Sequence, residues 1–343
     1  MRARGFGYRL GAARRNSGLV VPGHWVWCGS IVADPAAGYH MFASIWEQSV
    51  PFHPFWVSHS RIVRAFAPRI EDPFVIEEEV LPPRSPACWD GRATHNPTVV
   101  SHGGRYYLYY TGITYPEPFP DPSDGSSPFF RSQTARRSQR IGVAVASHPR
   151  GPWRRPAAPL LEPRPGRWDA LMTTNAAPCA AGEGRFLLAY KSSPAPRGLL
   201  MYGMTCGPGP EGPFARISDQ PIFDFYAHGN HSEDACIWRG RDGLEMLMKD
   251  MTGGLCGEAG AGIHATSEDG VKWNVSPGIA FPRQLDWTDG TRSHPGCLER
   301  PQIVLHDGRP SHLVLAMTDG PETILNARHT RNVVVPLLPT TNA

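Results

Sequence analysis

Residues 95–112 read HNPTVVSHGGRYYLYYTG. The polar pair His95-Asn96 opens a short apolar strand, and a tight turn at Gly103-Gly104 leads into a second strand of alternating, largely aromatic residues. Two short strands joined by a glycine turn are the signature of a β-hairpin. This hairpin is the pattern with which the rest of the chain can be compared.

The same plan returns four more times. The second strands of the other copies lie at 39–44, 186–191, 244–249 and 311–316. A third strand recurs as well, as at 141–146. Aligned on Ser30, Asn96, Asn175, Asp234 and Arg300, the copies are spaced by roughly 59 to 79 residues, longer than the usual propeller repeat. Four short strands per unit, repeated five times, predict an all-β fold, a five-bladed β-propeller, rather than an ordinary β-sandwich. The predicted blades of this single domain, 1–343, are 24–82, 89–163, 168–224, 229–282 and 285–337.

Composition excludes several other classes of protein. The 36 Gly and 36 Pro suit a turn-rich β-protein, and a net charge of +3 without a basic stripe argues against a nucleic-acid partner. The seven Cys, with no CxxC, predict free thiols in a reducing compartment. No signal-peptide core or membrane-length apolar run is found, so we expect a cytoplasmic protein without a membrane partner, either a monomer or a homodimer. Segment 116–140, rich in Pro and Ser, is expected to be a loop.

The openings of the five units are unusually polar. In a propeller the innermost strand of each blade lines the central channel, so the starts of these strands meet at one end of it. The openings read Trp27-Cys28-Gly29-Ser30, His95-Asn96, Thr174-Asn175, Glu233-Asp234 and Glu299-Arg300. Carboxylates, amides and cations are costly to bury unless they are paired or used. The sequence therefore predicts a functional pocket at this end of the channel.

Four carboxylates are candidates for catalysis: Asp90, Glu233, Asp234 and Glu299. Asp90 belongs to a Trp-Asp-Gly phrase that is echoed at Asp169, so it is either a turn residue or a carboxylate at the pocket rim. Glu233 and Asp234 are adjacent on a strand, and only one of them can face straight into the channel. The alternative for Glu299 with Arg300 is a buried ion pair.

The expected substrate-binding residues are Trp27, His95, Asn96, Asn175, Lys191, His231, Lys249, His294 and Arg300. Lys191 and Lys249 end the second strands of two blades in equivalent places, where they either pair with carboxylates or are solvated. Trp27 lies in an aromatic-rich stretch that is either core or a surface for stacking on a sugar. No metal motif is found, although a channel ion such as Ca²⁺, held by carbonyls and waters, would leave none.

Several of these phrases resemble five-bladed glycoside hydrolases of the family 43 and family 117 type. The matching residues are 39–44, 95–98, 141–144, 232–234 and 299–302, and the resemblance spans roughly residues 25 to 320. It implies an enzyme that removes a terminal sugar from an oligosaccharide, by an exo-acting and inverting hydrolysis with Asp/Glu acid–base catalysis.

Carried over from the resemblance, Asp234 and Glu299 match acidic positions of the fourth and fifth blades, and a His such as His231 or His294 can replace the acid. The first-blade Asp that commonly serves as general base has no counterpart, because Gly29-Ser30 stands there. Either Asp90 or Glu233 supplies the base, or the chemistry differs, or activity is lost. The alternatives are a non-catalytic carbohydrate-binding propeller and a lyase or phosphorylase on the same fold.

Overall fold

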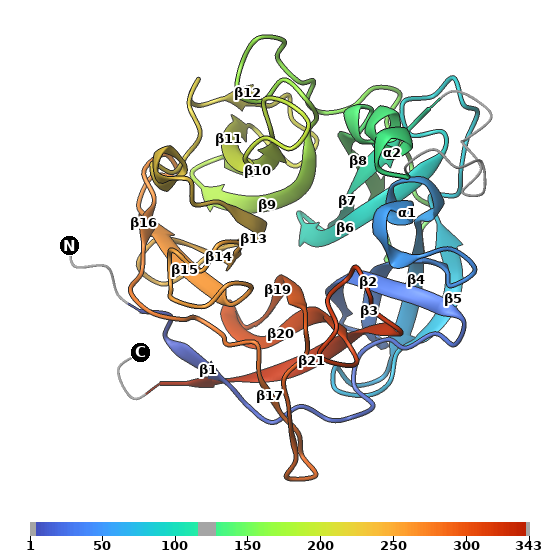
Figure 1. The fold of residues 1–343 in the computed structure, drawn as a ribbon, viewed down its shortest axis with the longest axis vertical. Coiled ribbons are helices and arrows are strands. Elements are labelled where there is room, and N and C mark those ends of the chain that lie inside the picture. Colours follow the sequence, from blue (N-terminus) through green and yellow to red (C-terminus); the bar gives the residue numbers. More distant parts are fainter. Residues whose placement is uncertain (1–4, 116–127, 341–343) are drawn as a thin grey trace.

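Antiparallel sheets are arranged around a common axis in the computed structural model, which describes residues 5–115 and 128–340 (Figure 1). Within these residues there are five sheets of three or four strands and one two-stranded ribbon. The sheets follow one another around the axis in the order of the chain. The predicted five-bladed β-propeller is therefore confirmed.

Each blade is built from neighbouring strands of the sequence. Blade 1 contains β2 (His24–Asp34), β3 (Gly38–Glu47), β4 (Arg61–Ala67) and β5 (Val75–Val80). Blade 2 contains β6 (Ala93–His102), β7 (Arg105–Ile113) and β8 (Arg140–Ala146). Blade 3 contains β9 (Thr174–Gly182), β10 (Arg185–Ser192), β11 (Met201–Gly207) and β12 (Ala215–Arg216). Blade 4 contains β13 (Ser232–Arg239), β14 (Leu244–Asp250), β15 (Gly262–Ser267) and β16 (Asn274–Val275).

Blade 5 joins the two ends of the described chain. It contains β19 (Leu298–His306), β20 (Arg309–Thr318), β21 (Thr330–Pro339) and the N-terminal strand β1 (Tyr8–Leu10). β1 pairs with β21 from Tyr8↔Pro339 to Leu10↔Leu337, so the outer edge of this blade is covered (Figure 1). The ribbon of β17 (Leu285–Asp286) and β18 (Arg292–Ser293) precedes this blade. The predicted fifth unit, 285–337, did not include strand β1. A strand of three residues is too short to show an alternating pattern in the sequence.

The core lies between neighbouring blades. Alternate residues of each strand point to opposite faces of its sheet, so both faces of a blade are apolar and pack against the next blade. One such layer joins Ala177 and Met204 of blade 3 to Met246 and Ile263 of blade 4. Because each layer needs both neighbours, closing the ring completes the core.

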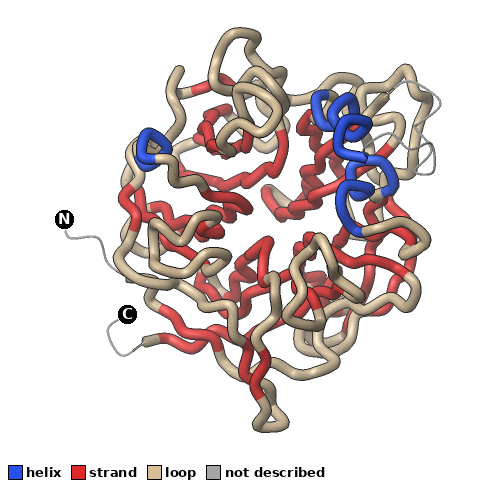
Figure 2. Tube along the Cα trace, viewed as in Figure 1, coloured by secondary structure: helices blue, strands red, loops and turns tan. Residues whose placement is uncertain are grey.

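Two helices lie on one side of the ring, where Figure 2 draws them in blue. They are α1 (Phe52–His59), between β3 and β4, and α2 (Pro128–Arg137), between β7 and β8. The loop predicted for 116–140 is thus wrong for Pro128–Arg137, which is helical, while 116–127 lie outside the described residues. A short 3₁₀ helix, η1 (Phe225–His228), precedes β13. None of the helices in the described residues is both long and apolar enough to span a membrane.

Candidate active site

Each innermost strand carries a β-bulge near its start. The residues in left-handed conformation there are Cys28 (φ 58°), Asn96 (52°), Asn175 (52°), Asp234 (63°) and Arg300 (58°). The pairing with the second strand shifts at the same five places. These bulges fix the repeat, and they place Cys28, not the polar Ser30, in the first blade. Ser30 instead accepts a hydrogen bond from the backbone of Val99.

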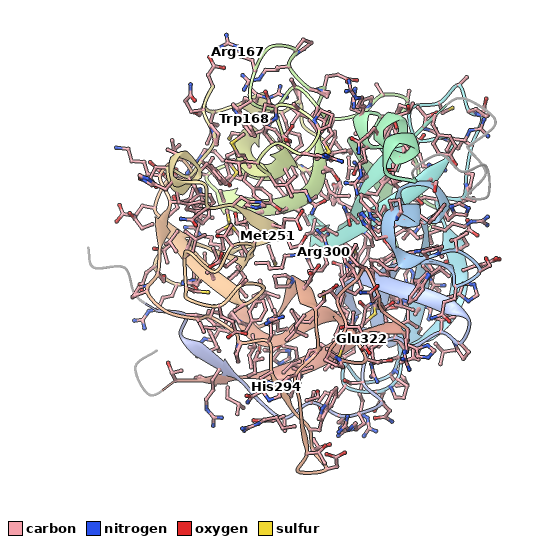
Figure 3. The ribbon with its side chains drawn as sticks, viewed as in Figure 1. Arg167, Trp168, Met251, His294, Arg300 and Glu322 are labelled. Atoms are coloured by element: carbon pink, nitrogen blue, oxygen red, sulfur yellow. The ribbon has the colours of Figure 1, made fainter. Side chains whose placement is uncertain are left out.

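The five bulge side chains form a ring that we call the inner ring. Its bonds run from Cys28 Sγ to Asn96 Oδ1 (3.0 Å), Asn96 Nδ2 to Asn175 Oδ1 (2.6 Å), Asn175 Nδ2 to Asp234 Oδ1 (3.1 Å) and Arg300 Nη1 to Asp234 Oδ1 (2.9 Å). Burial raises the pKa of the Cys28 thiol and the charge of the Arg300 guanidinium opposes that rise, so the last residue of the ring lies near the first. No member is more than 5% exposed. Since one member comes from each blade, the inner ring ties the five blades together around the axis, where Figure 3 labels Arg300.

A second set of contacts links each of the first four blades to the next through the second strand. The pairs are Ser44 Oγ with the Asn96 backbone N (3.2 Å), Thr111 with Thr174 (2.8 Å), Lys191 with Glu233 (2.6 Å) and Lys249 with Glu299 (2.9 Å). Ser44, Thr111, Lys191 and Lys249 are equivalent in the register. The two lysines thus replace the hydroxyls of the first two blades, and of the two predicted alternatives they adopt pairing with carboxylates.

Lys191, Glu233, Lys249 and Glu299 form one group, which we call the charge cluster. Lys191 Nζ lies 2.6 Å from Glu233 Oε1, and Lys249 Nζ lies 3.2 Å from Glu233 Oε2 and 2.9 Å from Glu299 Oε1. The Glu233 and Glu299 side chains are 17% and 15% exposed, whereas that of Asp234 is 4% exposed. The two glutamates are therefore open to water or a ligand, while Asp234 is held in the inner ring.

The two glutamates differ in acidity. Burial raises the pKa of the Glu233 carboxyl, but the Lys191 and Lys249 ammonium groups outweigh burial and hold that pKa well below its usual range. Burial also raises the pKa of the Glu299 carboxyl, and here Lys249 is opposed by the charges of Asp234 and Glu233, so the pKa stays above its usual value. One carboxyl group is thus kept ionised to lower pH than a free glutamate, and its neighbour takes up a proton at higher pH, the kind of difference that acid–base pairs use.

His95 is a buried, uncharged side chain beside the inner ring. Its Nδ1 lies 2.7 Å from Ser60 Oγ, its Nε2 lies 3.9 Å from Cys28 Sγ, and its ring stacks on Trp56 with centroids 4.8 Å apart. Burial, with the charges of Arg300 and Lys191, holds the pKa of His95 well below its usual value. The partners Trp56 and Ser60 come from α1 and the residue after it, and the repeat pattern gave no sign of them.

Two further predicted binding residues, Trp27 and His231, lie in more closed surroundings than Glu233 and Glu299. Trp27 is 5% exposed and packs edge-on against Phe52, with centroids 4.9 Å apart, inside an apolar cluster. Of its two predicted roles it therefore fills the core role. His231 lies just before β13, its buried Nδ1 has no partner among the described residues, and burial lowers its pKa despite the nearby Glu233 charge.

Asp90 lies in a closed ion cluster. It is 0% exposed, and its oxygens accept hydrogen bonds from Arg84 Nε (2.9 Å), Tyr110 Oη (2.7 Å) and Arg155 Nη2 (2.8 Å). Asp169, just before blade 3, makes the equivalent contacts with Tyr190 and two arginines. A carboxylate without exposed surface cannot reach an attacking water, so this geometry fits the predicted turn residue and not the general base.

His294 is also not brought into the charge cluster. It is exposed and it follows β18. Figure 3 labels it toward the edge of the molecule, away from Arg300. As to metals, no group of three or more His, Cys, Asp or Glu in residues 5–115 and 128–340 is arranged to hold an ion.

No protein-family model matches the sequence, and no curated protein matches it. The structure is similar to a family 117 glycoside hydrolase of the marine bacterium Zobellia galactanivorans, with a TM-score of 0.66, 15% identity, and coverage of 97% of this chain and 91% of that chain. It is also similar to a family 43 β-xylosidase/α-arabinofuranosidase from a compost metagenome (0.58, 14%, 99% and 97%) and to an α-L-arabinofuranosidase of Lactobacillus brevis (0.56, 13%, 95% and 94%). At such identities the similarity shows a shared fold, and it confirms the predicted resemblance to these hydrolases at that level.

Proposed function

We propose that this protein is a glycoside hydrolase that removes a terminal sugar from an oligosaccharide at the charge cluster. The observation that carries the proposal is the pair of partly exposed glutamates, Glu233 and Glu299, whose pKa values are shifted in opposite directions around one shared lysine. Hydrolysis of a glycosidic bond needs two carboxyl groups in opposite protonation states. The neighbouring folds, which include a β-xylosidase/α-arabinofuranosidase and a family 117 hydrolase, support the same reaction class.

In the proposed mechanism Glu299 is the general acid and Glu233 the general base. Glu299 gives its proton to the glycosidic oxygen as the bond to the sugar breaks, and Glu233 removes a proton from the water that attacks the anomeric carbon. Lys249 Nζ is 3.2 Å from one carboxylate and 2.9 Å from the other, so the facing oxygens are at most about 6 Å apart, which is shorter than the roughly 6.5–9.5 Å that inverting enzymes leave for the attacking water. Inversion at the anomeric carbon is part of the proposal, and it requires the two glutamates to move apart when the substrate binds. NMR of the first-formed anomer tests it, and retention of configuration would count against it.

Glu233 takes the place of the absent first-blade Asp in this mechanism. At that position the bulge residue is Cys28, and burial raises the pKa of its thiol to about 12, so the thiol stays protonated and cannot act as a base. Glu233 is ionised at every pH at which the enzyme is expected to work. Asp234 positions Arg300 and Asn175 without touching the reacting atoms.

A second candidate function is a carbohydrate-binding propeller without catalysis. It is favoured by the pairing of both Glu233 oxygens with lysines, because a carboxylate held by two cations is a weak base. Binding without turnover would identify this alternative.

The test is a screen of the purified protein on aryl glycosides and oligosaccharides, with released sugar as the readout. We expect release of one terminal sugar, and a loss of about 10²- to 10⁴-fold in kcat for Glu299→Gln and for Glu233→Gln. Glu268→Gln, at an exposed position of blade 4, is the matched control and should be unchanged. Full turnover in both active-site variants would refute the assignment.

A further inference from the structure

Arg136 is a cation without an acidic partner among the described residues. It lies near the end of α2, partly buried, with its guanidinium over the Trp56 ring at 5.0 Å from the centroid. Its Nε is buried and makes no hydrogen bond. A desolvated guanidinium that is not paired is costly, and burial indeed lowers the pKa of Arg136. Its position therefore needs an explanation outside the fold.

Arg136 is connected to the candidate active site by stacked rings. Trp56, which it covers on one side, stacks on His95 at 4.8 Å, and His95 opens the innermost strand of blade 2. The stack thus runs from α2 through α1 to β6. The charge of Glu233 acts on Arg136, so the guanidinium is within electrostatic reach of the charge cluster.

The ionisable groups of the site supply no counter-charge for Arg136. Glu233 and Asp234 pair with Lys191, Lys249 and Arg300, and Glu299, which also contacts Lys249, carries a proton in the proposed mechanism. Arg136 therefore adds a positive charge that no described carboxylate neutralises. A negatively charged group on the ligand would neutralise it.

We propose that Arg136 forms an anion subsite at the rim of the active site, and that the substrate is an acidic sugar with a carboxylate or a sulfate ester. This inference rests on the proposed function and names its substrate class. The two terminal Nη groups of the guanidinium form a planar edge that can bind two oxygens of such a group side by side. Trp56 holds that edge in place by stacking on the guanidinium face.

Equilibrium binding tests this inference without any need for turnover. Isothermal titration would compare methyl glucuronoside, methyl galacturonoside, methyl galactoside 6-sulfate, the neutral methyl glucoside and galactoside, and inorganic phosphate. We expect at least one acidic glycoside to bind about tenfold or more tightly than its neutral counterpart, and Arg136→Gln to abolish that difference. Arg137→Gln removes the same charge from the exposed neighbouring position of α2 and should leave binding unchanged. Arg136→Lys keeps the charge without the planar edge, and it should recover only part of the affinity.

The outcomes separate this inference from the hydrolase proposal. Binding of acidic sugars that depends on Arg136, without hydrolysis of them, supports the subsite and counts against the hydrolase. Hydrolysis of neutral glycosides that is unchanged in Arg136→Gln overturns the subsite and leaves the hydrolase. Preference for inorganic phosphate, or no binding of any anion at millimolar concentration, also overturns it. The uronosides and the sulfated glycoside tell which acidic group is recognised.

Discussion

Replacing Lys249 with methionine tests how far the charge cluster depends on its shared cation. The ammonium group lies 2.9 Å from Glu299, 3.2 Å from Glu233 and 3.9 Å from Asp234, and the Lys249 side chain is only 5% exposed. Methionine has a similar length but no charge. The substitution leaves the three carboxylates together, with Lys191 and Arg300 as the remaining cations.

The structure sets the expected loss of stability. Removing one partner from a buried ion pair costs about 3–5 kcal/mol, because the other charge is left buried without compensation. At about 2.1 cal/mol/K per residue, the unfolding entropy of this 343-residue chain is about 0.7 kcal/mol/K, so the unfolding midpoint should fall by about 4–7 °C. Lys272→Met, at an exposed position of blade 4, removes the same charge and should shift the midpoint by less than about 1 °C.

The loss should depend on pH with a definite sign. In the native protein the pKa of Glu233 is depressed, so Glu233 contributes stability above its unfolded pKa, and this stability is lost only as pH falls through the folded value. Without Lys249 the carboxyls can be neutralised by protons near pH 4, and the difference between variant and wild type should shrink there. Thermal unfolding by circular dichroism from pH 4 to pH 8 measures both effects. Equal midpoints for Lys249→Met and Lys272→Met at pH 7 would show that the charge cluster does not depend on Lys249.

Two further predictions concern stability and rate. Asp90→Asn breaks a buried ion cluster and should cost about 3–5 kcal/mol of stability while kcat of the folded protein stays unchanged; a stable variant with no turnover would restore Asp90 as the general base. The pH profile of kcat/KM should fall as pH rises through the raised pKa of Glu299, and on the acid side only where Glu233, with its depressed pKa, takes up a proton. Glu299→Gln should remove the alkaline limb, and a limb that persists in this variant would assign it to another group.

Most of the fold could be predicted from the sequence because it repeats. Each blade shows the same polar opening and apolar alternation, and the register was right at Asn96, Asn175, Asp234 and Arg300. The predicted register was wrong in the first blade, where Ser30 was chosen because it is polar. The bulge residue in that blade is Cys28, whose thiol is less polar than the side chains at the other four positions. A left-handed residue in a bulge leaves no periodic signal, so only the structure identifies it.

The candidate site was predicted in part for the same reason. Residues within the repeat, such as Lys191 and Lys249, were expected where the structure has them. Residues from insertions were not, and Arg136 and Trp56 belong to helices between strands. In α1, His53 and the following Pro interrupt the helical backbone, which hides any helical period. Contacts between insertions far apart in the chain are set by packing, which a single sequence does not display.

The role of Glu299 as the general acid is tested most directly by the way in which the hydrolysis rate of Glu299→Gln depends on the leaving group. In the proposed mechanism Glu299 protonates the departing oxygen, and a leaving group that is stable as an anion needs no such proton. For the sugar identified in the screen, the variant should hydrolyse a 2,4-dinitrophenyl glycoside at close to the wild-type rate. It should hydrolyse the corresponding methyl glycoside about 10²- to 10⁴-fold more slowly than wild type. An equal loss on both substrates would contradict the role of Glu299 as the general acid.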